Sequence, residues 1–231
     1  MTEETASAPG ERARTSPHGT EQDGGVKADL HRYLKKAREN LRWKLDGLAE
    51  RELRMPMTRT GTNLLGLLKH VSSVEVGYFT DCFGRPSGID VPWLEDEAEP
   101  NADMYATAEE SVESVFVLAD RCAAASDAVI DDLDLDAVGT VPWWNDESVT
   151  LGELMVHVLA EYQRHLGHAD IVRELLDGQA GLSARNSNLP GGMPDDAPGT
   201  GSADWWAGYV DRLRAIAESA PRSGSSPQPG P

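Results

Sequence analysis

The segment TLGELMVHVLAEYQRHLGHADIVRELLDG, residues 150–178, decides the fold of this chain. Its apolar residues recur at the three- and four-residue spacing of a single helical face. Thr150 and Glu153 form a helix start signal, because their side chains can satisfy backbone N–H groups that the first turn leaves free. Gly178 is a common helix terminator. These features predict one long amphipathic helix over residues 151–178.

Three upstream segments carry the same helical pattern, over residues 26–52, 64–83 and 108–132. The Gly61–Asn63 segment supplies capping side chains to the second of them, and Gly84 ends it. Each of the four predicted helices has one apolar stripe that must be covered by a neighbour. The pattern therefore predicts an all-α fold, a four-helix bundle.

The remaining segments are predicted to be loops, one short helix and tails. Residues 85–105 read as a long loop suited to a crossover, and a linker over residues 181–201 precedes a fifth helix that begins near Trp205. No run of alternating β-branched residues predicts a sheet. Four tryptophans could line a pocket or anchor loops, and anchoring is favoured. They are Trp143, Trp144, Trp205 and Trp206.

The N-terminal end of the chain mixes Thr, Glu, Ser, Pro and Gly, and the C-terminal end is mostly Ser, Pro and Gly. Neither end can bury enough apolar surface to offset the entropy lost on ordering. We expect residues 1–25 and 221–231 to be disordered tails. Between them, residues 26–220 are expected to form one helical domain, since a chain of 231 residues can bury a single full core.

The charge balance excludes several classes of partner. The formal net charge is −18 and the sequence pI is about 4.6, so phosphate backbones and anionic lipid would both be repelled. We therefore expect no nucleic acid and no membrane partner. The chain has no apolar run long enough for a signal peptide or a membrane span, and Cys82 and Cys122 read as buried, reduced thiols. A cytoplasmic location follows.

A histidine-rich face on the last bundle helix is the main chemical signal. His157, Glu161, His165 and His168 share one side of it, and groups one turn apart can hold a divalent ion together. A third ligand must come from another helix, where His70 is the best placed and His31 is the weaker candidate. The predicted site is a metal centre formed by His70, Glu161 and His165, with coordination positions left open.

Other polar residues near these stripes have more ordinary interpretations. His157 and His168 are expected to be partly buried and hydrogen-bonded, with an outer-shell role as the alternative. His31 lies beside charged residues and is expected to be solvated. Glu75 falls inside an apolar stripe, so it requires a partner if it is buried.

Two motifs together resemble the DinB-like superfamily: LLGLLKH (residues 64–70) followed by Glu75, and EYQRHLGHADIVRELLDG (residues 161–178). The similarity covers about residues 29–178 and is closest to a branch common in actinobacteria. It implies a four-helix bundle with a divalent metal on one histidine of the second helix and two ligands of the fourth. Those positions are His70, Glu161 and His165. In having a glutamate at position 161, this chain resembles the related mycothiol-dependent maleylpyruvate isomerases. Many DinB-like proteins have a histidine at that position.

The resemblance implies a metal-binding protein that is a thiol-dependent S-transferase acting on small electrophiles. Mycothiol would be the co-substrate, and zinc is the favoured ion, with nickel or iron as alternatives. No catalytic acid or base is assigned. The competing hypothesis is that the chain is a non-catalytic, stress-related protein that binds a metal or another ligand. Membership of a family does not by itself establish that a protein catalyses the reaction of its relatives. A homodimer would cover any apolar surface that the bundle leaves exposed.

Overall fold

A computed structural model describes residues 25–95, 97–186, 189 and 203–220. The two segments predicted to be tails lie outside the described residues except for Gly25, and so does most of the predicted linker. None of the described helices is long and apolar enough to cross a membrane.

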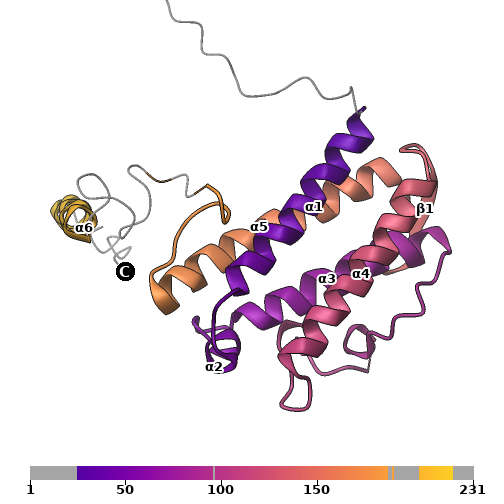
Figure 1. Ribbon diagram of the computed structural model, residues 1–231. Helices are drawn as coiled ribbons and strands as arrows, with labels where there is room; N and C mark the ends of the chain where they lie inside the picture. Colours follow the sequence, from indigo (N-terminus) through magenta and orange to yellow (C-terminus); the bar gives the residue numbers. More distant parts are fainter. Residues whose placement is uncertain (1–24, 96, 187–188, 190–202, 221–231) are drawn as a thin grey trace, which may run out of the picture.

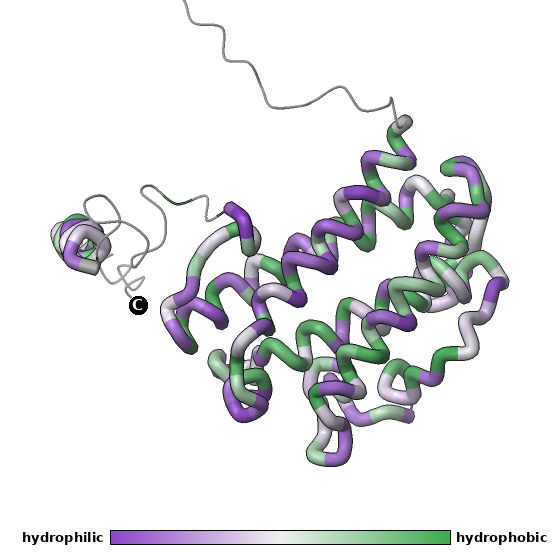
Figure 2. The backbone as a smooth tube through the Cα atoms, viewed as in Figure 1, coloured by the Kyte–Doolittle hydropathy of each residue, from purple (hydrophilic) through white to green (hydrophobic). Residues whose placement is uncertain are grey.

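Four helices form a bundle, as the sequence predicts. They are α1 (Val26–Leu45), α3 (Leu64–Thr80), α4 (Val112–Asp132) and α5 (Leu151–Asp177). Helix α3 packs against both α4 and α5, and α1 packs along α5 (Figure 1). Figure 2 shows apolar residues concentrated along α3, whereas polar residues are frequent along α1. The all-α prediction is confirmed.

Helix α3 is the central element and is buried along nearly its whole length. Its N-cap is Asn63, whose side chain accepts a hydrogen bond from the Gly66 N–H at 2.7 Å. Because the helix is so enclosed, its two charged residues, Lys69 and Glu75, are both buried, at 1% and 0% exposure. Each of these charges must therefore find a partner inside the protein.

The first helix is shorter than predicted, because it ends at Leu45 rather than near residue 52. Gly47 follows with a φ of 75°, a left-handed conformation that suits glycine. The guanidinium of Arg173 on α5 donates hydrogen bonds to the carbonyl oxygens of Lys44 and Asp46, at 2.9 and 2.8 Å. These bonds satisfy carbonyls at the helix end, and a separate short helix, α2 (Glu50–Arg54), follows.

The boundaries of the other helices are set by local caps. Helix α5 starts and ends as predicted, with the Thr150 hydroxyl accepting from the Glu153 N–H and Gly178 in the left-handed region. Helix α4 starts at Val112, four residues later than predicted, because Ser111 is its N-cap. Three-residue 3₁₀ turns punctuate the connections: η1 (Asp81–Phe83), η2 (Pro92–Leu94), η3 (Ala102–Met104) and η4 (Pro142–Trp144).

A small β-hairpin before α5 was not predicted. Strand β1 (Val138–Val141) pairs antiparallel with β2 (Glu147–Thr150). The connection contains η4 and two residues with positive φ, Asn145 and Asp146. Two strands of four residues are too short for a clear alternating pattern. The hairpin places the tryptophans of η4 beside the bundle.

The α1 and α4 helices are joined by ion pairs. Asp127 on α4 accepts hydrogen bonds from His31 Nε2 and Arg38 Nη1 on α1, each at 2.7 Å, and Arg42 pairs with Asp120. His31 is only 7% exposed. The prediction of a solvated His31 is wrong, because the carboxylate that covers it comes from a distant part of the sequence.

The fifth predicted helix is present as α6 (Ala203–Ser219). Trp205 stacks on Tyr209, with ring centroids 5.4 Å apart. Trp205 is 39% exposed, and Val210, Leu213 and Ile216 are exposed as well. Trp205 is therefore not a fully buried core residue, and its ring contacts those of Trp206 and Tyr209 on the same helix.

Candidate metal centre

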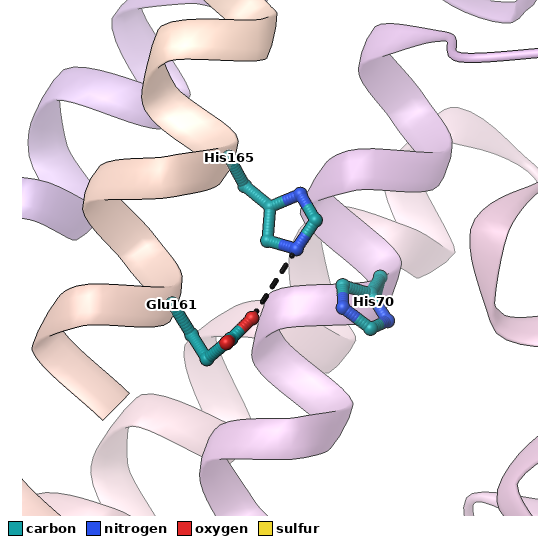
Figure 3. A group of neighbouring side chains, drawn as sticks. All are labelled: His70, Glu161 and His165. Carbon is teal, nitrogen blue, oxygen red and sulfur yellow. Dashed lines mark ion pairs between the residues drawn. The ribbon is translucent and has the colours of Figure 1, made fainter. Parts of the chain in front are cut away.

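His70, Glu161 and His165 lie together, with one ligand atom from each within 4.8 Å of the other two (Figure 3). His70 comes from α3, whereas Glu161 and His165 are one turn apart on the facing side of α5. The two imidazole rings meet edge to face, with centroids 4.7 Å apart. The long α5 fixes the Glu161–His165 spacing, and the packing of α3 against α5 supplies the third group.

The Asp103 carboxylate orients His70. Its Oδ2 lies 2.6 Å from His70 Nδ1, and the two side chains are 16% and 18% exposed. A carboxylate at Nδ1 favours the tautomer with the proton on that nitrogen, so the lone pair of Nε2 remains free. Carboxylate–histidine pairs of this kind are the usual outer shell of metal-binding histidines.

His168 contacts the corresponding nitrogen of His165, although its own group is an imidazole rather than a carboxylate. The two Nδ1 atoms are 3.3 Å apart, and His165 Nε2 lies 3.5 Å from a Glu161 carboxylate oxygen. Burial, followed by the nearby charge of His70, lowers the pKa of His165 to about 4. Near neutral pH this imidazole is therefore uncharged, which is the form that binds a metal. When Nδ1 carries the proton, the bare Nε2 faces the Glu161 carboxylate, and a metal cation would bind to both groups.

The loop that carries Asp103 is fastened to α3 by Lys69, the residue before His70. The Lys69 ammonium donates to the carbonyl oxygens of Ala102 and Tyr105, at 3.1 and 3.0 Å, and pairs with Glu110 at 2.9 Å. It also lies 3.9 Å from the centre of the Trp93 ring. A buried cation with this many partners is well satisfied, and it holds η3 and Asp103 against the helix.

The donor set suits a divalent ion. Two imidazoles and one carboxylate are borderline and hard ligands, as found in sites for zinc, nickel and non-haem iron. The side chains of His165, His70 and Glu161 are 10%, 18% and 31% exposed, so the group is enclosed on the helix side and reachable from solvent. Three protein ligands leave at least one coordination position for another molecule.

The family model for mycothiol-S-transferase matches residues 29–178. The chain belongs to this family. No curated protein and no solved structure matches the chain. The matched region runs from α1 to the end of α5, so it contains every residue of the candidate centre and the loop that supports it. The resemblance to DinB-like, mycothiol-related proteins is confirmed.

Within this member of the mycothiol S-transferase family, the other predicted residues have distinct places. His157 is not part of the three-residue group; its ring packs between those of Tyr78 and Trp144, at 4.8 Å from each. His168 was expected to be partly buried, but its side chain is exposed. Its Nδ1 contacts His165 Nδ1, as the alternative outer-shell role requires. Cys82 and Cys122 are free and buried as expected. Burial raises the pKa of each thiol to about 12, so neither is suited to act as a nucleophile.

Glu75 has the partner that the sequence could not name. Arg38 Nη2 and Nε donate to its two carboxylate oxygens at 2.6 and 3.1 Å, and the Tyr162 hydroxyl donates to it at 2.6 Å. Sequence reasoning missed Arg38, Asp103 and Lys69 as functional or supporting residues. Lys69 carried a usable signal, since a lysine inside the apolar LLGLLKH motif must be buried and paired.

Proposed function

We propose that this protein is a metal-dependent thiol S-transferase that binds one divalent ion through His70, Glu161 and His165 and uses mycothiol as co-substrate. The observation that carries the proposal is the arrangement of the two histidines. Each has Nδ1 engaged by a neighbour, and each offers Nε2 to the space beside Glu161. The family match over residues 29–178 supports the choice of thiol.

A bound divalent ion would lower the pKa of a thiol beside it and so supply the thiolate form near neutral pH. In the transfer, a C–S bond forms between the thiol sulfur and the electrophilic carbon while the bond to the leaving group breaks, and the thiol proton passes to solvent. His70 and His165 act as neutral donors, Glu161 adds one negative charge, and Asp103 and His168 hold the rings in place. The ligand set is the one expected for zinc, with nickel or iron as alternatives.

The deciding experiment compares the metal content and thiol transfer of the purified wild-type protein, His70→Ala and His165→Ala. His157→Ala is the matched control, because it removes an α5 histidine that lies outside the group. We expect one equivalent of metal in the wild type and in the control. Each ligand variant should lose affinity by more than the roughly 10–100-fold typical of outer-shell changes. Unchanged metal content in both ligand variants would overturn the proposed site.

Thiol specificity requires its own measurement on the metal-loaded protein. We expect mycothiol to bind and to react with a small alkyl halide, and His165→Ala to lose both properties. Binding of metal without any affinity for mycothiol would favour the competing hypothesis of a non-catalytic binding protein.

The setting of this activity is part of the proposal. We infer a cytoplasmic location, because both buried cysteines are free thiols and the reaction consumes a reduced thiol. A homodimer would cover Val156, Ile171 and Leu175, which are 57–60% exposed on α5. Light scattering on the purified protein tests the dimer.

A further inference from the structure

A cleft opens one helical turn away from the candidate metal centre, between α3, η2 and η4. Its volume is about 320 Å³, which is in the range of small-molecule sites. Helix α3 contributes Val74, Gly77 and Tyr78 to its wall, and Leu94 and Trp143 contribute from the two 3₁₀ turns. The cleft therefore has a largely apolar and aromatic lining.

Two residues of the cleft wall, Val74 and Tyr78, relate the cleft to the metal centre. Val74 follows His70 by one turn on α3. On the other side, the Tyr78 ring contacts His157, which precedes Glu161 by one turn on α5. The pKa of Tyr78 is raised, first by burial and also by nearby negative charge that includes Glu161. A molecule in the cleft would therefore lie about one helical turn from His70 along α3, beside the Tyr78 ring that contacts His157.

The aromatic wall is held in place by its own contacts. The Trp143 indole N–H donates a hydrogen bond to the Tyr78 hydroxyl at 3.2 Å, and the two rings meet edge to face at 5.1 Å. Trp143 nevertheless remains 52% exposed. A fixed but exposed indole is a surface on which a flat apolar group or an organic cation can lie.

The charged side chains that line the cleft are negative. Asp81 and Glu95 both line it, and among the described residues of its lining none is Lys, Arg or His. The nearby Lys69 is occupied by two carbonyl oxygens and Glu110. A negative charge on a ligand would therefore meet repulsion here, whereas a positive charge would meet two carboxylates and an aromatic face.

The geometry points to this cleft as the binding site for the electrophile, and to a preference for apolar aromatic electrophiles that are cationic or neutral over those that are anionic. The inference rests on the proposed function, because it assigns the second substrate of the same reaction.

The test uses three benzyl bromides with a para trimethylammoniomethyl group, a para methyl ester or a para carboxylate. In each reaction the thiol sulfur displaces bromide from the benzylic carbon, and every rate is divided by the uncatalysed rate with the same thiol. At low ionic strength we expect kcat/KM to fall from cation to ester to carboxylate, by about tenfold or more overall. In the double variant Asp81→Asn/Glu95→Gln, the ratio of kcat/KM between the cationic and the anionic bromide should fall to about threefold or less.

Glu97→Gln/Glu109→Gln is the matched control, since it removes two loop carboxylates that do not line the cleft. It should leave the ratio of kcat/KM between the cationic and the anionic bromide as in the wild type. Trp143→Ala should raise KM for the electrophile and leave KM for mycothiol unchanged. Equal turnover of all three bromides, or a rise in KM for mycothiol alone, would overturn the inference while the proposed transferase function stands.

An equilibrium measurement covers the case in which no bromide is turned over, which would overturn the proposed function. Benzyltrimethylammonium and 4-methylbenzoate are unreactive analogues of the cationic and anionic bromides. We expect the metal-loaded protein to bind the cation more tightly, and Asp81→Asn/Glu95→Gln to abolish the difference. Equal binding of the two analogues by the wild type would overturn the assignment of the cleft.

Discussion

The Asp103 carboxylate lies 2.6 Å from Nδ1 of His70, although the two residues are 33 positions apart in the chain. Asp103 belongs to η3, a short turn in the loop between α3 and α4. The loop therefore completes a site whose ligands lie on helices. The orientation of His70 depends on how firmly η3 is held against α3.

Replacing this carboxylate tests its role. We expect Asp103→Asn to fold normally and to lower metal affinity about 10–100-fold, because the amide fixes the imidazole tautomer less strongly than the carboxylate. Competition with a chromophoric chelator measures the change. Asp90→Asn alters an exposed carboxylate in the same loop and should leave the affinity unchanged. Equal affinities for all three proteins would show that His70 does not depend on Asp103.

The buried Arg38–Glu75 pair is expected to dominate the response of the bundle to mutation. Arg38→Met leaves the Glu75 carboxylate inside the core, where the Tyr162 hydroxyl is its one remaining hydrogen-bond partner among the described residues. Such an uncompensated charge typically costs about 3–5 kcal/mol of unfolding free energy. Urea unfolding measures this loss of unfolding free energy. The control is Arg32→Met, which breaks an exposed pair with Asp29 and should cost less than about 1 kcal/mol.

A second substitution separates charge from packing in this pair. Arg38→Met/Glu75→Gln removes the orphan charge and keeps an acceptor for Tyr162, so it should be more stable than Arg38→Met alone. Equal stability of the two variants would mean that the loss comes from the packing of the Arg38 side chain.

Asp127 should make the stability of the protein sensitive to acid. Burial alone would raise its pKa, but hydrogen bonds from His31 and Arg38 outweigh burial and lower it. A lowered carboxyl pKa stabilises the fold above the unfolded pKa, and this contribution disappears as the pH falls through the lower folded value. Asp127→Asn should cost about 1–3 kcal/mol near pH 7 and flatten the loss of stability below about pH 4.

The control for this prediction is Asp120→Asn, whose carboxylate pairs with Arg42 and is 67% exposed. It should change the unfolding free energy by less than about 1 kcal/mol at either pH. An Asp127→Asn profile parallel to that of the wild type would contradict the assigned cause.

The sequence was most informative where the pattern is local. The periodicity and caps of residues 151–178 are contained in the segment itself, so the predicted ends of α5 agree with the structure. The end of α1 depends instead on Arg173, which lies more than a hundred residues away in the chain. The predicted helix therefore extends several residues beyond the observed end at Leu45. The Asp46–Gly47 turn is a weak signal for a helix end, and the strong apolar stripe around it favours continuing the helix.

The same reasoning applies to the candidate site. His165 and Glu161 share one helical face, and His70 stood out as the histidine beside the second apolar stripe, so their proximity was predictable. The roles of Asp103 and Arg38 were not predictable, because they arise only when loops and helices from elsewhere in the chain pack together. The burial of Lys69 could be inferred from its apolar motif, but its partners could not. The burial of His31 escaped prediction for the same reason.

Gly66 makes the close approach of η3 to α3 possible. A Cβ added to Gly66 would lie 1.8 Å from the carbonyl oxygen of Met104, the residue after Asp103. Asn63 Nδ2 also donates to that oxygen at 3.2 Å, which fixes the turn in place. An alanine at this position therefore forces the turn, and with it Asp103, away from the helix.

We expect Gly66→Ala to destabilise the fold by about 1–3 kcal/mol, the usual cost of overpacking, and to lower metal affinity as far as Asp103→Asn does. Gly167→Ala is the matched control: a Cβ added there would have no heavy atom within 4 Å outside its own helix turn, and the substitution should be neutral or stabilising by up to about 1 kcal/mol. Thermal unfolding and the chelator titration report the two effects separately. If Gly66→Ala loses stability but retains full metal affinity, Asp103 reaches His70 without help from the packing of η3 on α3.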